Sequence, residues 1–264
     1  MLLVGQGSVG KTSLIKQLTE GKFDPHENIT EGINIEKWQL PVDDQEIRLN
    51  VWDFGGQEIM HATHQFFLTK RSLYLLILDS RLNEEDNRLE YWIKIIQSFG
   101  GDSPIIIVSN KTDQHPPDLD RRGLKRKYTN IRGFAETSCK TGYGIDKLKE
   151  MITGEISNLE HIRVQLITSW FDVKNQLENM KKNYISYKVF QNICQKKNIK
   201  DSLSQKTLIG FLHDLGIVLN FQDDPRLEDT NILNPEWVTN GVYKIINSNE
   251  LFQSKGVLER KGNT

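Results

Sequence analysis

The sequence is poor in cysteine, with only Cys139 and Cys194 in 264 residues. Two thiols are too few for a disulfide framework or a zinc cluster, and such scarcity is typical of proteins from a reducing compartment. We therefore expect a cytoplasmic protein in which both cysteines are buried as small apolar side chains.

Long apolar runs are also missing from the sequence. No run approaches the roughly 18 residues that a membrane-spanning helix needs, so a membrane span is excluded. The apolar residues 2–4 lead directly into a glycine-rich loop and not into a cleavage site, which argues against a signal peptide. Because the chain starts on its first strand, we expect that a further segment precedes it in the full protein.

Neither sign of charge is in excess. The chain has 34 basic and 35 acidic side chains, a formal net charge of −1. No global field therefore favours nucleic acid or an anionic membrane, and partners must be recognised by local sites. The length suggests two compact units, each large enough to bury a core.

What the sequence does contain is a phosphate-binding pattern near its start. Residues 5–12 read G-Q-G-S-V-G-K-T, between a strand-like run at 2–4 and a helical period over 13–18. In such a loop backbone N–H groups converge on phosphates, the lysine places a charge near the β and γ groups, and the threonine hydroxyl binds Mg²⁺. The predicted nucleotide-binding residues of this segment are Gly5, Gly7, Ser8, Val9, Gly10, Lys11, Thr12 and Ser13.

Strand-like runs recur along the first half, at residues 48–53, 73–79 and 105–110, separated by stretches with helical period. This alternation predicts a doubly wound α/β fold with a mostly parallel sheet. In such folds, ligands bind at the carboxyl ends of the strands.

Two further segments supply residues for a metal and a γ-phosphate. Residues 53–58 read D-F-G-G-Q-E at a predicted strand end, which places Asp53 to hold Mg²⁺ through water and Gly56 to meet the γ-phosphate. Gln57 is then the catalytic residue that orients the attacking water, together with Lys11. Thr30 precedes another strand pattern and is the candidate switch threonine, binding Mg²⁺ only while the γ-phosphate is present. The predicted metal ligands are Thr12, Thr30 and Asp53.

The base is predicted to be guanine. Asn110, Lys111 and Asp113 form an N-K-x-D motif after a strand, in which the carboxylate accepts hydrogen bonds that adenine cannot offer. An unpaired buried carboxylate is costly, so a guanine preference of about 10⁴-fold is expected. Residues 137–140 read T-S-C-K, and a backbone N–H of this loop, formed by Ser138, Cys139 and Lys140, is expected to read guanine O6. An ATP-dependent enzyme fits only if Asp113 is displaced from the base.

The order of these motifs resembles that of Ras-like small GTPases, and the sequence of residues 52–67 is similar to that of the Roc domain of the Roco family. Residues 212–221 and 232–239 resemble the COR domain that follows Roc in that family. The resemblance implies a Roc domain over residues 1–155, a P-loop GTPase that binds GTP and GDP with Mg²⁺ and acts in signalling. It implies the N-terminal part of COR over residues 156–264, with the other COR half removed. It also implies a homodimer in the full protein, assembled mainly through COR and coupled to the nucleotide state.

Without the family, the second half still predicts a smaller α+β unit. Apolar residues from 166 to 180 recur at helical spacing, and Ser186, Ser204 and Asn234 are candidate helix caps, the last with Pro235 after it. Strand candidates at 217–222 and 231–233 complete a winged-helix-like order. We expect Trp237 and Tyr243 of the last helix to lie in the COR core or against Roc. A DNA reader is the rival interpretation, but the nearly balanced charge of this half argues against nucleic acid.

Hydrolysis is expected to be slow, because no arginine can be assigned to neutralise transition-state charge, a deficit worth about 10³ to 10⁵ in rate. Arg71 and Arg81 are either donors to another subunit or exposed residues in salt bridges. The alternative function is a nucleotide-gated scaffold or dimerisation module with negligible turnover. Whether this chain is itself a dimer is left open.

Overall fold

The computed structural model of the protein describes residues 1–264 except 31, 43–44, 56–66, 160–165, 223 and 249–264. The first unit is built on a six-stranded sheet in the order β2-β3-β1-β4-β5-β6. All neighbours are parallel except β2 and β3, which form an antiparallel hairpin. The mostly parallel sheet predicted from the sequence is therefore confirmed. The strands are β1 (Leu2–Val4), β2 (Ile33–Val42), β3 (Gln45–Phe54), β4 (Tyr74–Asp79), β5 (Ile105–Asn110) and β6 (Ile131–Glu136).

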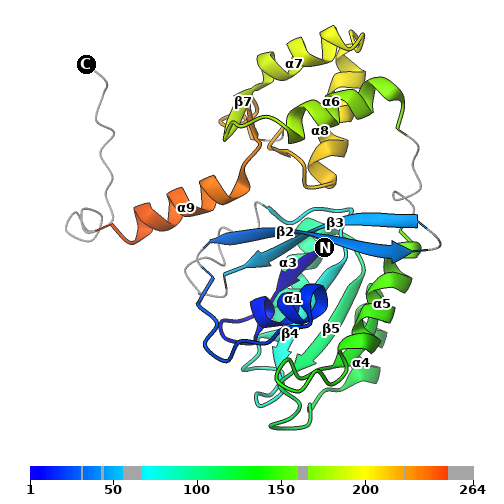
Figure 1. Ribbon diagram of the computed structural model, residues 1–264, viewed down its shortest axis with the longest axis vertical. Helices are drawn as coiled ribbons and strands as arrows, with labels where there is room; N and C mark the ends of the chain where they lie inside the picture. Colours follow the sequence, from blue (N-terminus) through cyan, green and yellow to red (C-terminus); the bar gives the residue numbers. More distant parts are fainter. Residues whose placement is uncertain (31, 43–44, 56–66, 160–165, 223, 249–264) are drawn as a thin grey trace.

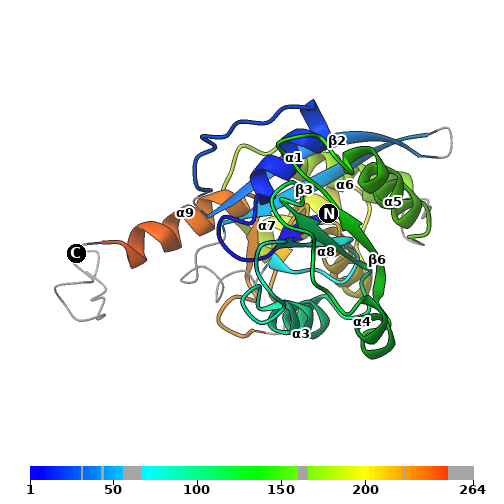
Figure 2. The ribbon, with the colours of Figure 1, turned by 90° about the horizontal axis from the view of Figure 1, so that it is seen from below.

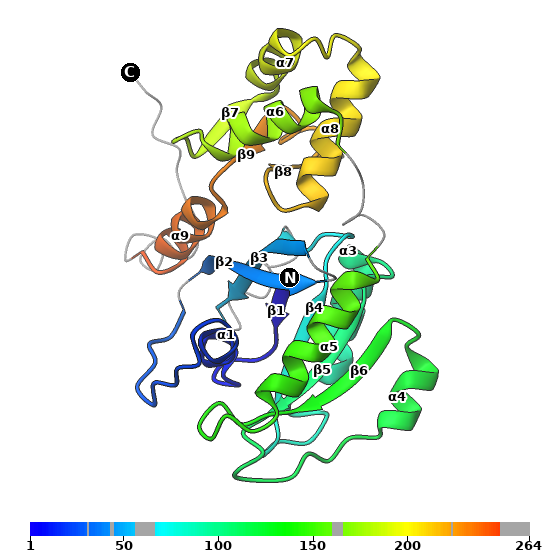
Figure 3. The same cartoon turned by 45° about the vertical axis from the view of Figure 1, so that its right-hand side comes forward.

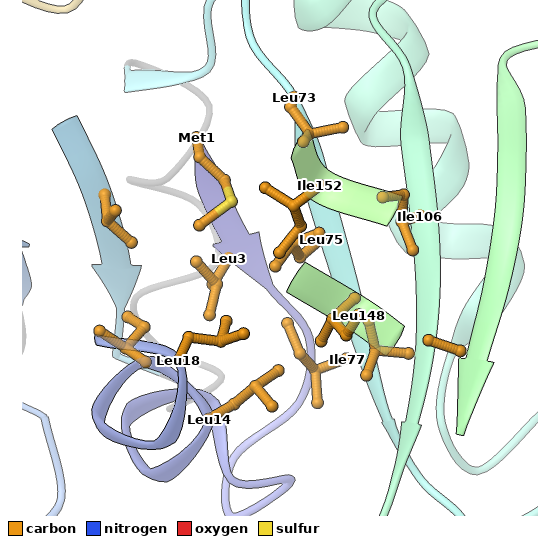
Figure 4. Packing of buried hydrophobic residues seen from close by; sticks show 14 of the residues in the cluster. Met1, Leu3, Leu14, Leu18, Leu73, Leu75, Ile77, Ile106, Leu148 and Ile152 are labelled. Atoms are coloured by element: carbon orange, nitrogen blue, oxygen red, sulfur yellow. The ribbon is translucent and has the colours of Figure 1, made fainter. Parts of the chain in front are cut away.

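Helices cover both faces of this sheet (Figure 2). One face packs against α1 (Lys11–Glu20) and α5 (Ile145–Ser157), and the other against α3 (Leu89–Gly100) and α4 (Arg121–Lys127). Strands β4 and β5 are buried along their whole length because both of their faces are covered, as in other parallel sheets. Figure 4 shows the first of these layers, where Leu14 and Leu18 of α1 and Leu148 and Ile152 of α5 meet the sheet.

The second unit is smaller. It contains α6 (Thr168–Glu178), β7 (Tyr184–Ser186), α7 (Tyr187–Lys196), α8 (Ser202–Asp214), β8 (Leu219–Asn220), β9 (Thr230–Ile232) and α9 (Pro235–Ile246). Its strands form a sheet in the order β7-β9-β8. The winged-helix-like order is present, with one strand, β7, that the sequence did not predict. The predicted pairing of the 217–222 and 231–233 segments is confirmed, although β8 is shorter than its predicted range.

Two of the three predicted helix N-caps are confirmed, and one is wrong. Ser186 accepts a hydrogen bond from the N–H of Val189, and Asn234 accepts one from Trp237 with Pro235 in the first turn. Helix α8, in contrast, is capped by Asp201, which accepts from the N–H of Ser204 at 2.7 Å. Ser204 was predicted as the cap, but the Asp201 side chain caps the helix three residues earlier, so Ser204 lies inside the first turn.

The two units share apolar core. Leu219 of β8 and Ile232 of β9 belong to the same buried cluster as Trp52 and Phe54 of β3. Figures 1 and 3 show the second unit seated over the β2–β3 hairpin. Two ion pairs add to this contact, Arg48 with Glu178 at 2.7 Å and Arg71 with Asp214 at 3.1 Å. Within the described ranges, no helix is both long enough and apolar enough to cross a membrane.

Candidate nucleotide site

A cavity of about 390 Å³ lies where the loop after β1 enters α1, a size usual for small-molecule sites. Eight of the predicted site residues line it, namely Gly7, Ser8, Gly10, Lys11, Thr12, Ser13, Thr30 and Lys111. The segment between α1 and β2 forms the opposite wall and includes Phe23, an aromatic side chain that the sequence motifs did not single out. The strand order therefore gathers residues from distant motifs at one cavity.

The loop backbone requires glycine at two positions. Gly5 has φ +140°, and a Cβ there would lie 2.3 Å from the carbonyl oxygen of Ile77. Gly10 has φ +94°, and a Cβ there would lie 2.5 Å from Nδ2 of Asn110. Gly10 also caps α1 without any side-chain hydrogen bond, so the first-turn N–H groups remain directed at the cavity. A helix start of this kind attracts anions through its free N–H groups and its dipole.

The Lys11 side chain is held in place by the backbone of the phosphate-binding loop. Its Nζ donates to the carbonyl oxygens of Gly5 at 2.9 Å and Gln6 at 2.8 Å. Burial lowers the pKa of Lys11 to about 8, although the nearby charge of Asp53 opposes this shift. An anion bound in the cavity would restore the favoured charge, because an opposite charge stabilises a buried ammonium.

The three predicted metal ligands come together. The hydroxyl of Thr12 lies 2.6 Å from Oδ2 of Asp53 and 2.7 Å from the hydroxyl of Thr30, and Thr30 donates to the same Asp53 oxygen at 3.1 Å. The other carboxylate oxygen, Oδ1, is buried and has no hydrogen-bond partner in the described part of the chain. Burial raises the pKa of Asp53, against the hydrogen bonds from the two threonines and the charge of Lys11.

This donor set fits magnesium. Mg²⁺ prefers hard oxygen ligands and usually keeps one or two carboxylates, with water and phosphate oxygens completing its shell. Two hydroxyls and one carboxylate, of which one oxygen is buried and unpartnered, match that preference. No cluster of three or more His, Cys, Asp or Glu side chains that could hold another kind of metal occurs among the described residues.

The two base motifs are tied to the phosphate loop and to each other. Asn110 donates from Nδ2 to the carbonyl oxygen of Val9 at 2.9 Å, and its Oδ1 accepts from Cys139 N at 3.3 Å. Ser138 donates to Oδ1 of Asp113 at 2.7 Å, which leaves the second oxygen of that exposed carboxylate for a ligand. The Cys139 thiol is buried, and burial raises its pKa to about 12, so this side chain is a neutral packing group. Lys140 is exposed at the surface of the same loop.

Asp79, at the end of β4, is a residue of this site that the sequence motifs did not reveal. Its Oδ2 accepts from Nζ of Lys111 at 2.8 Å, and the same Nζ donates to the carbonyl oxygen of Ser8 at 2.6 Å. Burial disfavours the Asp79 carboxylate, but hydrogen bonds from Arg81 and Lys111 outweigh it and lower the pKa of Asp79 to about 2. The signal was the strand-end position of an Asp, which alone does not distinguish a site from a cap.

The remaining predicted residues fall into two groups. Gly56 and Gln57 lie outside the described residues, so the position of the predicted catalytic glutamine stays a prediction. Arg71 and Arg81 both form salt bridges, Arg71 with Asp214 and Arg81 with Asp79, which fits the salt-bridge interpretation of these arginines. Arg71 also lies 5.2 Å from the ring centroid of Phe211.

Helix α9 reaches the segment that follows Thr30 (Figure 3). Glu236 accepts a hydrogen bond from the backbone N–H of Ile35 at 3.1 Å. Gly32 has φ +72°, and a Cβ there would lie 2.9 Å from the hydroxyl of Thr239. The N–H of Gly55, the residue after β3, donates to the carbonyl oxygen of Gly32 at 2.8 Å. The second unit thus contacts backbone two residues from a candidate metal ligand.

Comparison with known proteins agrees with this arrangement. Residues 1–113 match the family described as "Ras of Complex, Roc, domain of DAPkinase", and residues 168–262 match "C-terminal of Roc, COR-A domain". A probable serine/threonine-protein kinase of Dictyostelium discoideum, pats1, is 32% identical over 99% of this chain and 9% of its own length. The Roc-COR-CHAT protease of Runella zeae is 30% identical over 93% of this chain and 29% of its own length. The chain therefore spans a minor part of these relatives.

A solved structure gives a closer likeness over most of both chains. The structure of Methanosarcina barkeri Roco2 RocCORdC bound to GDP is 52% identical, with a TM-score of 0.90, and the match covers 97% of this chain and 79% of that one. The order of motifs, the Ras-like sheet, the winged-helix-like second unit and these matches lead to one conclusion: the chain belongs to the Roco family and comprises a Roc GTPase domain followed by COR-A.

Proposed function

We propose that this chain binds GTP with Mg²⁺, hydrolyses it to GDP and acts as a nucleotide-controlled switch coupled to its COR segment, with the border between the two domains near residue 155. The observation that carries the proposal is the meeting of Thr12, Thr30 and Asp53 around a buried, unpartnered carboxylate oxygen. The GDP in the Roco2 structure supports a guanine nucleotide as the ligand.

Different residues of the chain bind the phosphates, the base and Mg²⁺ in this proposal. The N–H groups of the loop over residues 7–13 and the Lys11 ammonium hold the phosphates, and Asp113 with the Ser138–Lys140 loop holds the base. Thr12, Thr30 and Asp53 would hold Mg²⁺, which neutralises charge on the β and γ phosphates when bound. Gln57 orients the water that attacks the γ-phosphate.

Turnover is proposed to be slow. Both arginines considered from the sequence are held in salt bridges, and two guanidinium nitrogens of Arg81 donate to the Asp79 carboxylate. Without an arginine to neutralise transition-state charge, rates are lower by about 10³ to 10⁵. A second copy in the homodimer proposed for the full protein would be a source of such a group.

Contact of α9 with Gly32 and Ile35 favours a switch whose output is a change in COR position. A nucleotide-gated scaffold with negligible turnover shares this feature and is the second candidate. The two differ only in whether bound GTP is converted to GDP.

The test is single-turnover hydrolysis of Mg·GTP, with nucleotide identity followed by chromatography. The GTPase proposal expects GDP to form and Gln57→Ala to slow its formation. Bound GTP that persists unchanged would favour the scaffold. In parallel, Asp113→Asn should reduce the preference for GDP over ADP, and an unchanged preference would remove Asp113 from the base site.

A further inference from the structure

The network around Asp79 has no assigned role in the proposed site. Asp79 is buried, and its carboxylate accepts hydrogen bonds from three groups of Arg81, namely the backbone N at 3.1 Å, Nε at 2.9 Å and Nη2 at 2.6 Å. The Lys111 ammonium completes the set at 2.8 Å. One carboxylate therefore holds two cations at the edge of the nucleotide site.

The backbone of Asp79 is fixed as firmly as its side chain. The buried amide of Asn87 accepts from the N–H of Asp79 at 2.8 Å and donates to its carbonyl oxygen at 3.0 Å. Strand register places Asp79 directly beside Asn110, the first residue of the base motif. The carboxylate is therefore a fixed point against which flexible side chains can be positioned.

Lys111 needs such a fixed point. Its backbone has φ +66°, a conformation that costs energy for a residue with a side chain. Its Nζ bridges the Asp79 carboxylate and the carbonyl oxygen of Ser8 in the phosphate loop. Arg81 extends the network to the far side of the base motif by donating to Oε1 of Gln114 at 3.1 Å.

We propose that Asp79 is a positioning residue that ties the phosphate loop to the N-K-x-D loop through Lys111, and so sets how long a guanine nucleotide stays bound. Without the carboxylate, the ammonium loses its fixed partner and its bond to Ser8 is no longer held in place. One of the two links between the loops is then weakened, while the bond from Asn110 to Val9 remains. The inference rests on the proposed function, since it concerns the residence time of the same ligand.

The chain supplies a matched control. In the second unit, Asp224 holds Arg226 with the same i, i+2 geometry, accepting from its backbone N at 2.9 Å, Nε at 2.9 Å and Nη2 at 2.7 Å. No lysine joins this pair in the described part of the chain. Asp224→Asn therefore removes the same local contact without touching the nucleotide loops.

The experiment is the release of a fluorescent GDP analogue from the intact chain, chased with excess GDP in the presence of Mg²⁺. Release from Asp79→Asn should be roughly ten- to a hundredfold faster than from wild type, the fold-change for losing a hydrogen bond between charged groups. Lys111→Met should accelerate release similarly, and the double variant should release no faster than Lys111→Met alone. Asp224→Asn should match wild type.

Two results would overturn the inference. One is release from Asp79→Asn at the wild-type rate, and the other is a double variant whose release rate is increased by the product of the two single-variant factors. Circular dichroism and melting temperature report whether each variant is folded. If Asp79→Asn does not fold, Asp79→Glu replaces it, because this variant retains the charge but displaces it. Release from Asp79→Glu should still be accelerated, and release at the wild-type rate would count against the positioning role. Failure of wild type to bind guanine nucleotide at all would instead refute the proposed function.

Discussion

At the scale of single residues, Asp53 shows why a ligand site and a stable core make opposite demands. Its buried carboxylate keeps one oxygen without a partner in the described chain, an arrangement that costs free energy until a cation is present. Its proposed contribution is therefore to cation binding and not to stability.

Replacing Asp53 with Asn should separate these demands. We expect the nucleotide-free variant to melt no lower than wild type, because a buried charge with one unpartnered oxygen is gone. We also expect the gain in GDP affinity on adding Mg²⁺ to fall by at least roughly tenfold, since a hydrogen bond or metal contact to a charged group is lost. Calorimetry with and without Mg²⁺ measures the second effect, and a full Mg²⁺ response in the variant would contradict the assignment.

His213 gives a pH-dependent prediction at the same scale. Its Nδ1 accepts from the N–H of Asn220 at 3.3 Å, and burial lowers its pKa, against the charge of neighbouring Asp214. The unfolded chain then takes up a proton before the folded one, so this group costs stability as the pH falls through about 6.5. Wild type should lose up to about 1.4 kcal/mol per pH unit more than His213→Gln below that pH. Melting at pH 7.5, 6.5 and 5.5 measures the difference, and parallel losses would contradict it.

At the scale of elements, α9 joins the second unit to residues 32–35, which follow the proposed switch threonine. Gly32→Ala would place a methyl group against Thr239, and its φ of +72° adds strain of roughly 1–2 kcal/mol. We expect any nucleotide-dependent change in hydrogen exchange over α9 to disappear in this variant.

The control for that experiment is Gly21→Ala. Gly21 has φ +66° but open space where a Cβ would stand, so it carries the strain without the contact. If both variants keep the wild-type exchange difference between GDP and a GTP analogue, α9 does not follow the switch through Gly32.

Helix starts were predictable where they depend on hydrogen bonds between residues close in the sequence. Elements that form only by pairing with distant strands were less predictable. The caps Ser186 and Asn234 follow from side chains that reach N–H groups three residues away. Strand β7 exists because it pairs with β9, and the role of Asp79 depends on β4 lying beside β5. The expectation for Trp237 was wrong in part, because this side chain is 47% exposed and stacks on Tyr184, while Thr239 and Glu236 face the Roc domain.

Residues of the candidate site were likewise predictable where their position depends on local sequence, and not where it depends on the path of the chain. Phosphate and base motifs could be read from the sequence because their spacing is set by one loop and one strand end, and eight of the residues line one cavity. Phe23 could not be found this way, because it reaches the cavity only through the path of the chain between α1 and β2. Gly56 and Gln57 lie outside the described residues, so their roles stay predictions.

At the scale of the whole molecule, the dependence of hydrolysis on protein concentration tests whether the site is complete in one chain. We expect a slow single-turnover rate that is constant per molecule and lowered by Gln57→Ala. The slow reaction needs only the predicted catalytic residues of one Roc domain, whereas the accelerating arginine is proposed to come from a dimer of the full protein. A rate that climbs with concentration would contradict this and show that a second copy contributes to catalysis.

The packing of Leu219 and Ile232 into the cluster of Trp52 and Phe54 has a consequence for how the protein melts and how it can be divided. The border between Roc and COR in the sequence is not a border in the hydrophobic core. Thermal unfolding should therefore follow a single cooperative transition, and a fragment cut after α5 should expose aromatic surface and aggregate. On this prediction, the two domains recognised in the sequence behave as one unit of folding.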